Sequence, residues 1–109
     1  MQIKLFNKDQ GIFVLQLDTN NYIKFCPERG GVITNWVSDG NEILYFDEKR
    51  FMDNTKSIRG GIPILFPICG NHKISNSAFG TDYLQLSQHG FARDLQWQYN
   101  FNENEKSLC

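Results

Sequence analysis

The chain has 109 residues, 40% of them hydrophobic, and its 11 basic and 12 acidic side chains give a net charge of -1. A chain of this length forms one domain, residues 1–109, and its balanced charge gives no reason to expect a nucleic acid or a membrane surface as partner. No apolar run approaches the ~20 residues of a membrane span, and the first residues lack the apolar core of a signal peptide. We therefore expect a soluble, cytoplasmic protein.

Short stretches rich in β-forming residues alternate with turn signals along the first half of the chain. The expected strands are residues 12–17, 22–26, 32–37 and 42–46. Strands that recur at intervals of roughly 8–12 residues are typical of β-sandwiches and barrels. In the third of these strands, Val32, Thr34 and Trp36 should share one face. The expected fold class is all-β, with antiparallel strands.

The second half of the chain is less regular. Residues 47–56 are polar and predict a loop or one helical turn, and residues 82–86 favour a further strand. Residues 95–102 alternate between apolar and polar side chains, which is the pattern of a half-buried strand. The aromatic row of that strand needs a cover, and the polar tail behind it offers none. We therefore expect the chain to be the first part of a longer protein.

Two segments carry the most specific chemistry. The first starts at Arg59 and reads Arg-Gly-Gly-Ile-Pro-Ile-Leu-Phe-Pro, and the second runs from His89 to Arg93 and reads His-Gly-Phe-Ala-Arg. The glycines permit close backbone approach and the prolines remove hydrogen-bond donors, so the first segment should be rigid and irregular, with Arg59 at its edge. One histidine and two arginines on one surface suit an oxygen-rich or anionic ligand.

Each of these residues also has a purely structural interpretation. Arg59 could close a loop through backbone carbonyls, His89 could be a satisfied residue at a strand end, and Arg93 could form a solvated turn with Asp94. Cys69 is a weak candidate nucleophile, because no nearby histidine would activate it. The three cysteines match no zinc-ligand spacing, so we expect free thiols and no metal site.

In this order and at this spacing, the two segments resemble the aldose 1-epimerase (mutarotase) family, and most closely its hexose-6-phosphate mutarotase branch. Residues 30–36 and 41–45 resemble two earlier strands of that family, so the resemblance extends over residues 12–101. It implies an antiparallel β-sandwich of the galactose-mutarotase type, of which this chain is the N-terminal part. It also implies interconversion of the α and β anomers of a hexose or hexose 6-phosphate, with no metal or organic cofactor.

The resemblance also implies roles for individual residues. In that family a carboxylate takes the proton of the anomeric hydroxyl and a histidine protonates the ring oxygen, so that the ring opens and closes on the other face. By resemblance, Arg59 binds substrate, His89 is the first of two active-site histidines, and Arg93 is a second arginine that helps to bind phosphate. His89 should therefore point into the same cleft as Arg59.

The family's glutamate base and second histidine lie in the later part of its fold. The isolated chain is therefore expected to be an inactive N-terminal portion, whose partners are a small sugar or sugar phosphate and the missing C-terminal portion of the same fold. The alternatives are a non-catalytic carbohydrate-binding module and a structural fragment.

Overall fold

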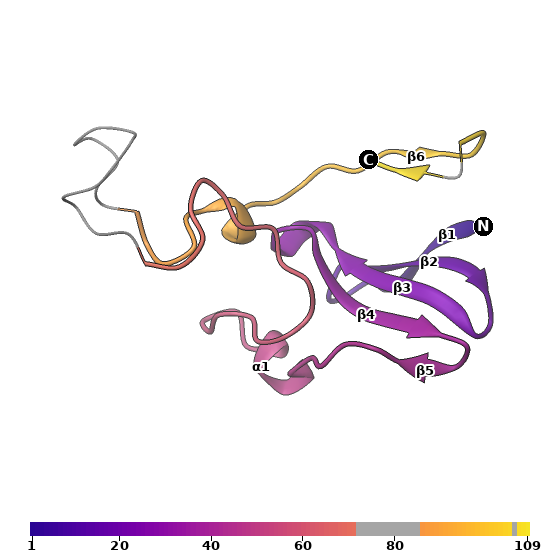
Figure 1. Cartoon of the computed structure of the whole chain (residues 1–109), viewed down its shortest axis with the longest axis horizontal. Helices are drawn as coiled ribbons and strands as arrows, with labels where there is room; N and C mark the ends of the chain where they lie inside the picture. The colour runs from indigo at the N-terminus through magenta and orange to yellow at the C-terminus, as the bar shows by residue number, and fades with distance from the viewer. Residues whose placement is uncertain (72–85, 106) are drawn as a thin grey trace.

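The computed structural model describes residues 1–71, 86–105 and 107–109, and the described residues contain antiparallel strands and one short α-helix (Figure 1). Five strands form one sheet in which each strand pairs with its sequence neighbour. They are β1 (Gln2–Asn7), β2 (Ile12–Asp18), β3 (Asn21–Cys26), β4 (Val32–Ser38) and β5 (Asn41–Glu42). The all-β, antiparallel class expected from the sequence is confirmed.

The strands β2, β3 and β4 agree with the expected ones to within one residue at each end. β1 is a further strand that the apolar pattern does not predict, because most of its residues are exposed at the edge of the sheet. The strand expected over residues 42–46 is wrong beyond Glu42. There the chain leaves the sheet, and Phe46 forms only an isolated bridge with Gly60.

A β-bulge in β4 changes which side chains are buried. The register between β3 and β4 shifts by one residue, which leaves Thr34 as an extra residue on β4. Val32 and Thr34 are fully buried, but beyond the bulge Val37 is buried and Trp36 is 45% exposed. The expectation that Trp36 shares a face with Val32 is therefore wrong, because an extra residue exchanges the two faces of a strand.

The helical turn expected within residues 47–56 is confirmed as the helix α1 (Glu48–Met52), which follows β5 in the chain (Figure 1). It begins at Asp47, whose side chain accepts a hydrogen bond from the Arg50 N–H at 3.0 Å, the usual way to satisfy a free donor at a helix start. Phe51 on this helix is only 2% exposed. The resulting core consists of Ile12, Cys26, Val32 and Phe51, with Phe46 and Ile58 packed against it. No helix in the described part of the chain is long and apolar enough to cross a membrane.

The strand expected over residues 95–102 is wrong for most of its length. Residues 96–99 belong to no strand, although the Trp97 N–H donates to the Pro27 carbonyl at 2.8 Å, and Asn100 exchanges both backbone hydrogen bonds with Cys109. The Tyr99 ring packs on Phe13 and Phe25, with ring centroids 4.9 and 5.7 Å apart. The sheet therefore covers part of the aromatic row itself.

The polar tail also differs from expectation, because it does form a strand. The chain ends in a small antiparallel ladder of β6 (Phe101–Asn102) and β7 (Ser107–Leu108) (Figure 1). The strand expected over residues 82–86 lies almost wholly outside the described residues.

Candidate functional site

The segment that carries Arg59 lies along the first half of β4, on the side that β5 occupies further along the strand. Ile62 and Ile33 exchange both backbone hydrogen bonds, at 3.0 and 2.8 Å. The Asp47 N–H donates to the Arg59 carbonyl at 3.0 Å, and the Gly61 N–H donates to the Tyr45 carbonyl at 2.8 Å. These bonds hold the backbone on both sides of Arg59, while the residue itself is exposed.

The segment that carries His89 docks onto the end of the proline-rich segment. Gly90 forms a parallel bridge with Phe66, and the Phe91 N–H donates to the Phe66 carbonyl at 2.9 Å. A Cβ atom on Gly90 would lie 2.2 Å from the Phe66 oxygen, well inside any real contact distance. Only glycine allows the two backbones to approach this closely.

The orientation of the His89 ring follows from its contact with Gly70. Nδ1 accepts a hydrogen bond from the Gly70 N–H at 2.6 Å, and the His89 N–H donates to the Gly70 carbonyl at 2.8 Å. Because Nδ1 is the acceptor, the neutral ring carries its proton on Nε2. Nε2–H is therefore the remaining hydrogen-bond donor of the ring.

Arg93 lies in the 3-10 helix η4 (Ala92–Asp94). Its Nη2 donates to the Gln88 carbonyl at 3.1 Å, but its Nε is buried and has no partner among the described residues. The backbone of Arg93 packs directly on Gly30, whose N–H donates to the Leu95 carbonyl at 2.8 Å. Since a buried donor without a partner is costly, the Nε atom is suited to a ligand oxygen or another acceptor.

These segments enclose a pocket of about 240 Å³. Its apolar part includes Val32, Pro63 and Leu65, and its polar part includes Arg29, Ser57, Arg59, His89, Arg93 and Asp94. Three arginines and one histidine, whose side chains carry hydrogen-bond donors, therefore line a small volume. Such a set of donors suits a compact ligand that is rich in oxygen or carries a negative charge.

Within the described part of the chain, no ion pair involves an arginine of the pocket. The ion pair found there joins Lys56 to Asp53 at 3.2 Å, and neither residue lines the pocket. Among the described residues that line it, Asp94 is the one carboxylate. No group of three or more metal-ligating side chains occurs in the described part of the chain.

No family model matches the chain, but comparison with known proteins finds similar sequences and structures. A protein of Cenchrus ciliaris named "Putative glucose-6-phosphate 1-epimerase" is 41% identical over 69 residues, which are 62% of this chain and 18% of that protein. The crystal structure of Slr1438 from Synechocystis sp. PCC 6803 is 44% identical and has a TM-score of 0.64. The resemblance to the mutarotase family is confirmed.

The extent of these matches is limited to part of each relative. The chain spans 18% of the Cenchrus protein, and the Slr1438 match covers 80% of this chain and 30% of Slr1438. The crystal structure of HI1317 matches 94% of this chain and 39% of its own, with 22% identity and a TM-score of 0.59, which supports the fold alone. The chain thus has the fold of one part of these larger proteins.

The structure brings the three predicted site residues of this mutarotase-like chain together. Arg59, His89 and Arg93 all line the same pocket, although the first two are far apart in the sequence. Their roles in binding or catalysis stay predictions. Cys69 is exposed and is not among the residues that line the pocket, which leaves no geometric support for a nucleophile there.

The pocket also contains residues that the motifs do not predict. Arg29, Ser57 and Asp94 line it together with the expected residues. A signal for Arg29 exists in the sequence, because Arg29-Gly30-Gly31 repeats the order of Arg59-Gly60-Gly61. Asp94 directly follows the second motif, where the sequence predicts a solvated turn. No sequence pattern around Ser57 predicts that it lines a pocket.

Other acidic side chains lie away from the pocket. Thr55 donates from its hydroxyl to Asp53 at 2.6 Å and from its N–H at 3.0 Å, and with Lys56 these bonds lower the pKa of Asp53 to about 2. Glu48 is exposed on α1 and does not line the pocket. Asp82 and His72 lie outside the described residues. In the core, burial raises the pKa of the Cys26 thiol.

Proposed function

We propose that the chain forms the substrate-binding part of an aldose 1-epimerase-type isomerase that acts on a hexose or hexose 6-phosphate. The observation that carries this proposal is the convergence of His89, Arg59 and Arg93 on one small pocket. The name of the Cenchrus relative supports the same reaction class and a phosphorylated sugar. The proposed setting is the cytoplasm, with a small sugar or sugar phosphate as the ligand and the rest of the same fold as the structural partner.

In the proposed reaction, His89 acts at the ring oxygen of the sugar. Its Nε2–H donates a hydrogen bond there and stabilises the negative charge that develops as the C1–O bond breaks. The bond from the Gly70 N–H to Nδ1 keeps the ring in this tautomer. The proton of the anomeric hydroxyl goes to a carboxylate as the C1 carbonyl forms, and the ring oxygen takes a proton from a histidine. The resemblance assigns the carboxylate and a second histidine to a later part of the fold.

The arginines hold the substrate in the proposed complex. Arg59 and Arg93 both line the pocket, and the side chain of Arg59 is exposed. A phosphate accepts paired hydrogen bonds from arginine more strongly than a sugar hydroxyl does. The pocket chemistry therefore favours a phosphorylated hexose over a free one.

The test is a titration of the 109-residue chain with glucose and glucose 6-phosphate, followed by the amide signals of Gly60, Gly61 and Gly90. Arg59→Ala should weaken glucose 6-phosphate binding by about 10- to 100-fold, the equivalent of a charge-assisted hydrogen bond, and glucose binding by much less. The control is Lys49→Ala, which removes one positive charge from an exposed position on α1 outside the pocket. Equal losses for both sugars would favour a plain aldose, and no binding of either would contradict the proposal for this chain.

Anomer exchange of both sugars, followed by NMR, separates an isomerase from a carbohydrate-binding module. General acid–base groups contribute roughly 10²–10⁴-fold, so the chain without the family's base should accelerate exchange by less than about a hundredfold. Faster exchange that Asp94→Asn abolishes would identify Asp94 as a base within this chain. Binding with no acceleration at all, even after the rest of the fold is supplied, would favour the binding module.

A further inference from the structure

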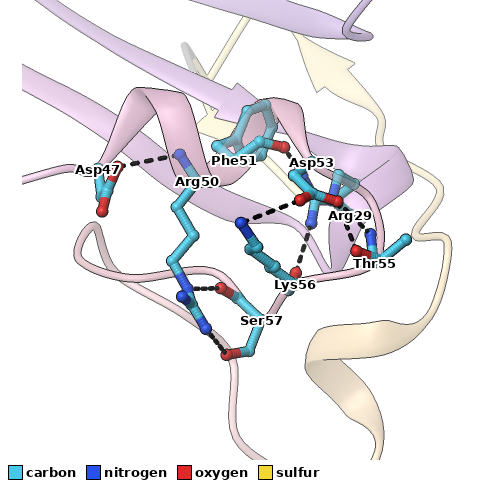
Figure 2. A network of polar contacts seen from close by, with 8 residues as sticks. All are labelled: Arg29, Asp47, Arg50, Phe51, Asp53, Thr55, Lys56 and Ser57. Carbon is cyan, nitrogen blue, oxygen red and sulfur yellow. Dashed lines mark hydrogen bonds and ion pairs between the residues drawn. The ribbon is translucent and has the colours of Figure 1, made fainter.

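Arg29 has an unusual position in the pocket wall, because it is tied to the segment that leads to Arg59. It ends the 3-10 helix η1 (Pro27–Arg29) and is half-buried. Its Nη1 donates to the Phe51 carbonyl and its Nη2 to the Lys56 carbonyl at 3.4 Å. The guanidinium carbon also lies 4.4 Å from the centroid of the Phe51 ring. One planar group therefore contacts both ends of residues 51–56 (Figure 2).

A second arginine, Arg50, forms hydrogen bonds to the residues just before Arg59. Figure 2 shows the side chain of Arg50 reaching Ser57, with Nε donating to the Ser57 carbonyl at 2.7 Å and Nη2 to its hydroxyl at 3.2 Å. The Arg59 carbonyl in turn accepts from the Asp47 N–H at 3.0 Å. The backbone carbonyls of residues 56, 57 and 59 are thus all bonded, which fixes the backbone of Arg59 while its side chain stays available.

The residue after Arg29 contacts the segment that carries Arg93. Gly30 packs against the backbone of Arg93 and donates its N–H to the Leu95 carbonyl. Arg29 and Gly30 therefore join the two motif-bearing segments at a single point of the chain. Loss of the hydrogen bonds from the Arg29 guanidinium would therefore change the distance between Arg59 and Arg93.

We propose that Arg29 is a positioning residue that holds Arg59 in place opposite His89 and Arg93. The two terminal nitrogens of Arg29, Nη1 and Nη2, bond to backbone carbonyls of residues 51–56, and the guanidinium lies over the ring of Phe51. It acts through the backbone of residues 56–59 and makes no contact with the ligand in this assignment. The consequence for ligand binding rests on the proposed function, whereas the consequence for the backbone does not.

The first measurement is amide hydrogen exchange of the 109-residue chain, read at the Asp47 N–H that bonds to the Arg59 carbonyl. Arg29→Lys should speed exchange at this amide by about tenfold, because a lysine cannot reproduce the planar fork to two carbonyls. Lys49→Met is the matched control. It removes an exposed positive charge from α1 without touching the Arg29 contacts, and it should leave the exchange rate of the Asp47 amide unchanged. Phe51→Leu should accelerate the same amide by removing the ring under Arg29. An unchanged rate in Arg29→Lys would overturn the proposal.

The second measurement is a double-mutant cycle with glucose 6-phosphate as the probe. Arg29→Lys alone should weaken binding by about five- to tenfold, and by less than about twofold when Arg59 is already alanine, because coupled residues are not additive. Losses that add would show that Arg29 contacts the ligand itself, and would overturn the positioning role. If the unaltered chain binds no glucose 6-phosphate, the proposed function is wrong for this chain, and hydrogen exchange at Asp47 alone decides the role of Arg29.

Discussion

Replacement of Gly30 by alanine tests how the two walls of the pocket are joined. Gly30 has a φ of +69°, and an added Cβ would lie 2.1 Å from the Arg93 oxygen and 2.5 Å from its Cα. The left-handed backbone costs a residue with a Cβ about 1–2 kcal/mol. Relief of the overlap requires residues 93–95 to move, which breaks the Gly30–Leu95 hydrogen bond at a cost of about 1 kcal/mol. We expect a total loss of roughly 2–3 kcal/mol or more in the free energy of unfolding.

The assay is urea denaturation of the 109-residue chain, with Gly40→Ala as the matched control. Gly40 has a φ of +79° in the turn before β5, but its nearest neighbour to an added Cβ is 4.0 Å away. Gly40→Ala should therefore cost only the backbone component, about 1–2 kcal/mol. Gly30→Asn separates the two causes, since asparagine tolerates the left-handed region but still carries a Cβ. Equal losses at Gly30 and Gly40, or full recovery in Gly30→Asn, would refute the steric argument.

Two further predictions concern titration and thiol reactivity. The Asp53 carboxyl should titrate near pH 2 in an NMR titration. Because its pKa in the folded chain lies below the ordinary 3.8, its contribution to the free energy of unfolding is complete above pH 3.8 and is lost as the pH falls from 3.8 toward 2. Thr55→Val should return the pKa toward 3.8, and an apparent pKa near 3.8 in the unaltered chain would contradict the hydrogen bonds described. In the folded chain, Ellman's reagent should modify the exposed Cys69 and Cys109 rapidly but reach the buried Cys26 only after urea is added; immediate reaction of all three thiols would contradict the burial of Cys26.

The strands of the first half could be predicted from the sequence because their signals are local. The apolar runs of β2, β3 and β4 are bounded by turn residues, and these signals place their ends to within one residue. β1 has no such signal, since an edge strand with exposed side chains needs only a neighbour to pair with. Pairing with β2, which the pattern of residues 2–7 does not encode, makes it a strand.

The alternating pattern of residues 95–102 shows the limit of periodicity. Alternation predicts which side chains share a face, but a strand also needs a second backbone for its ladder. In the described residues, Leu95 and Trp97 each make a single backbone hydrogen bond to the segment of residues 27–30, at Gly30 and Pro27, and a second backbone runs alongside as a ladder only from Asn100 onward. The single extra residue at Thr34 has a similar effect in β4, because only the register against β3 shows that the faces exchange.

The sequence by itself determined the local conformations of the two motifs and the types of residue that they carry. The motif glycines Gly60, Gly61 and Gly90, and the arginines and histidine beside them, are readable from the chain because each constrains its own backbone or supplies its own chemistry. Only the tertiary structure decided that Arg29 joins the site and that Arg59, His89 and Arg93 line one pocket of about 240 Å³. The physical reason is that contacts between residues far apart in sequence depend on how backbones pack, and at Gly30 and Gly90 that packing leaves no room for even a Cβ atom.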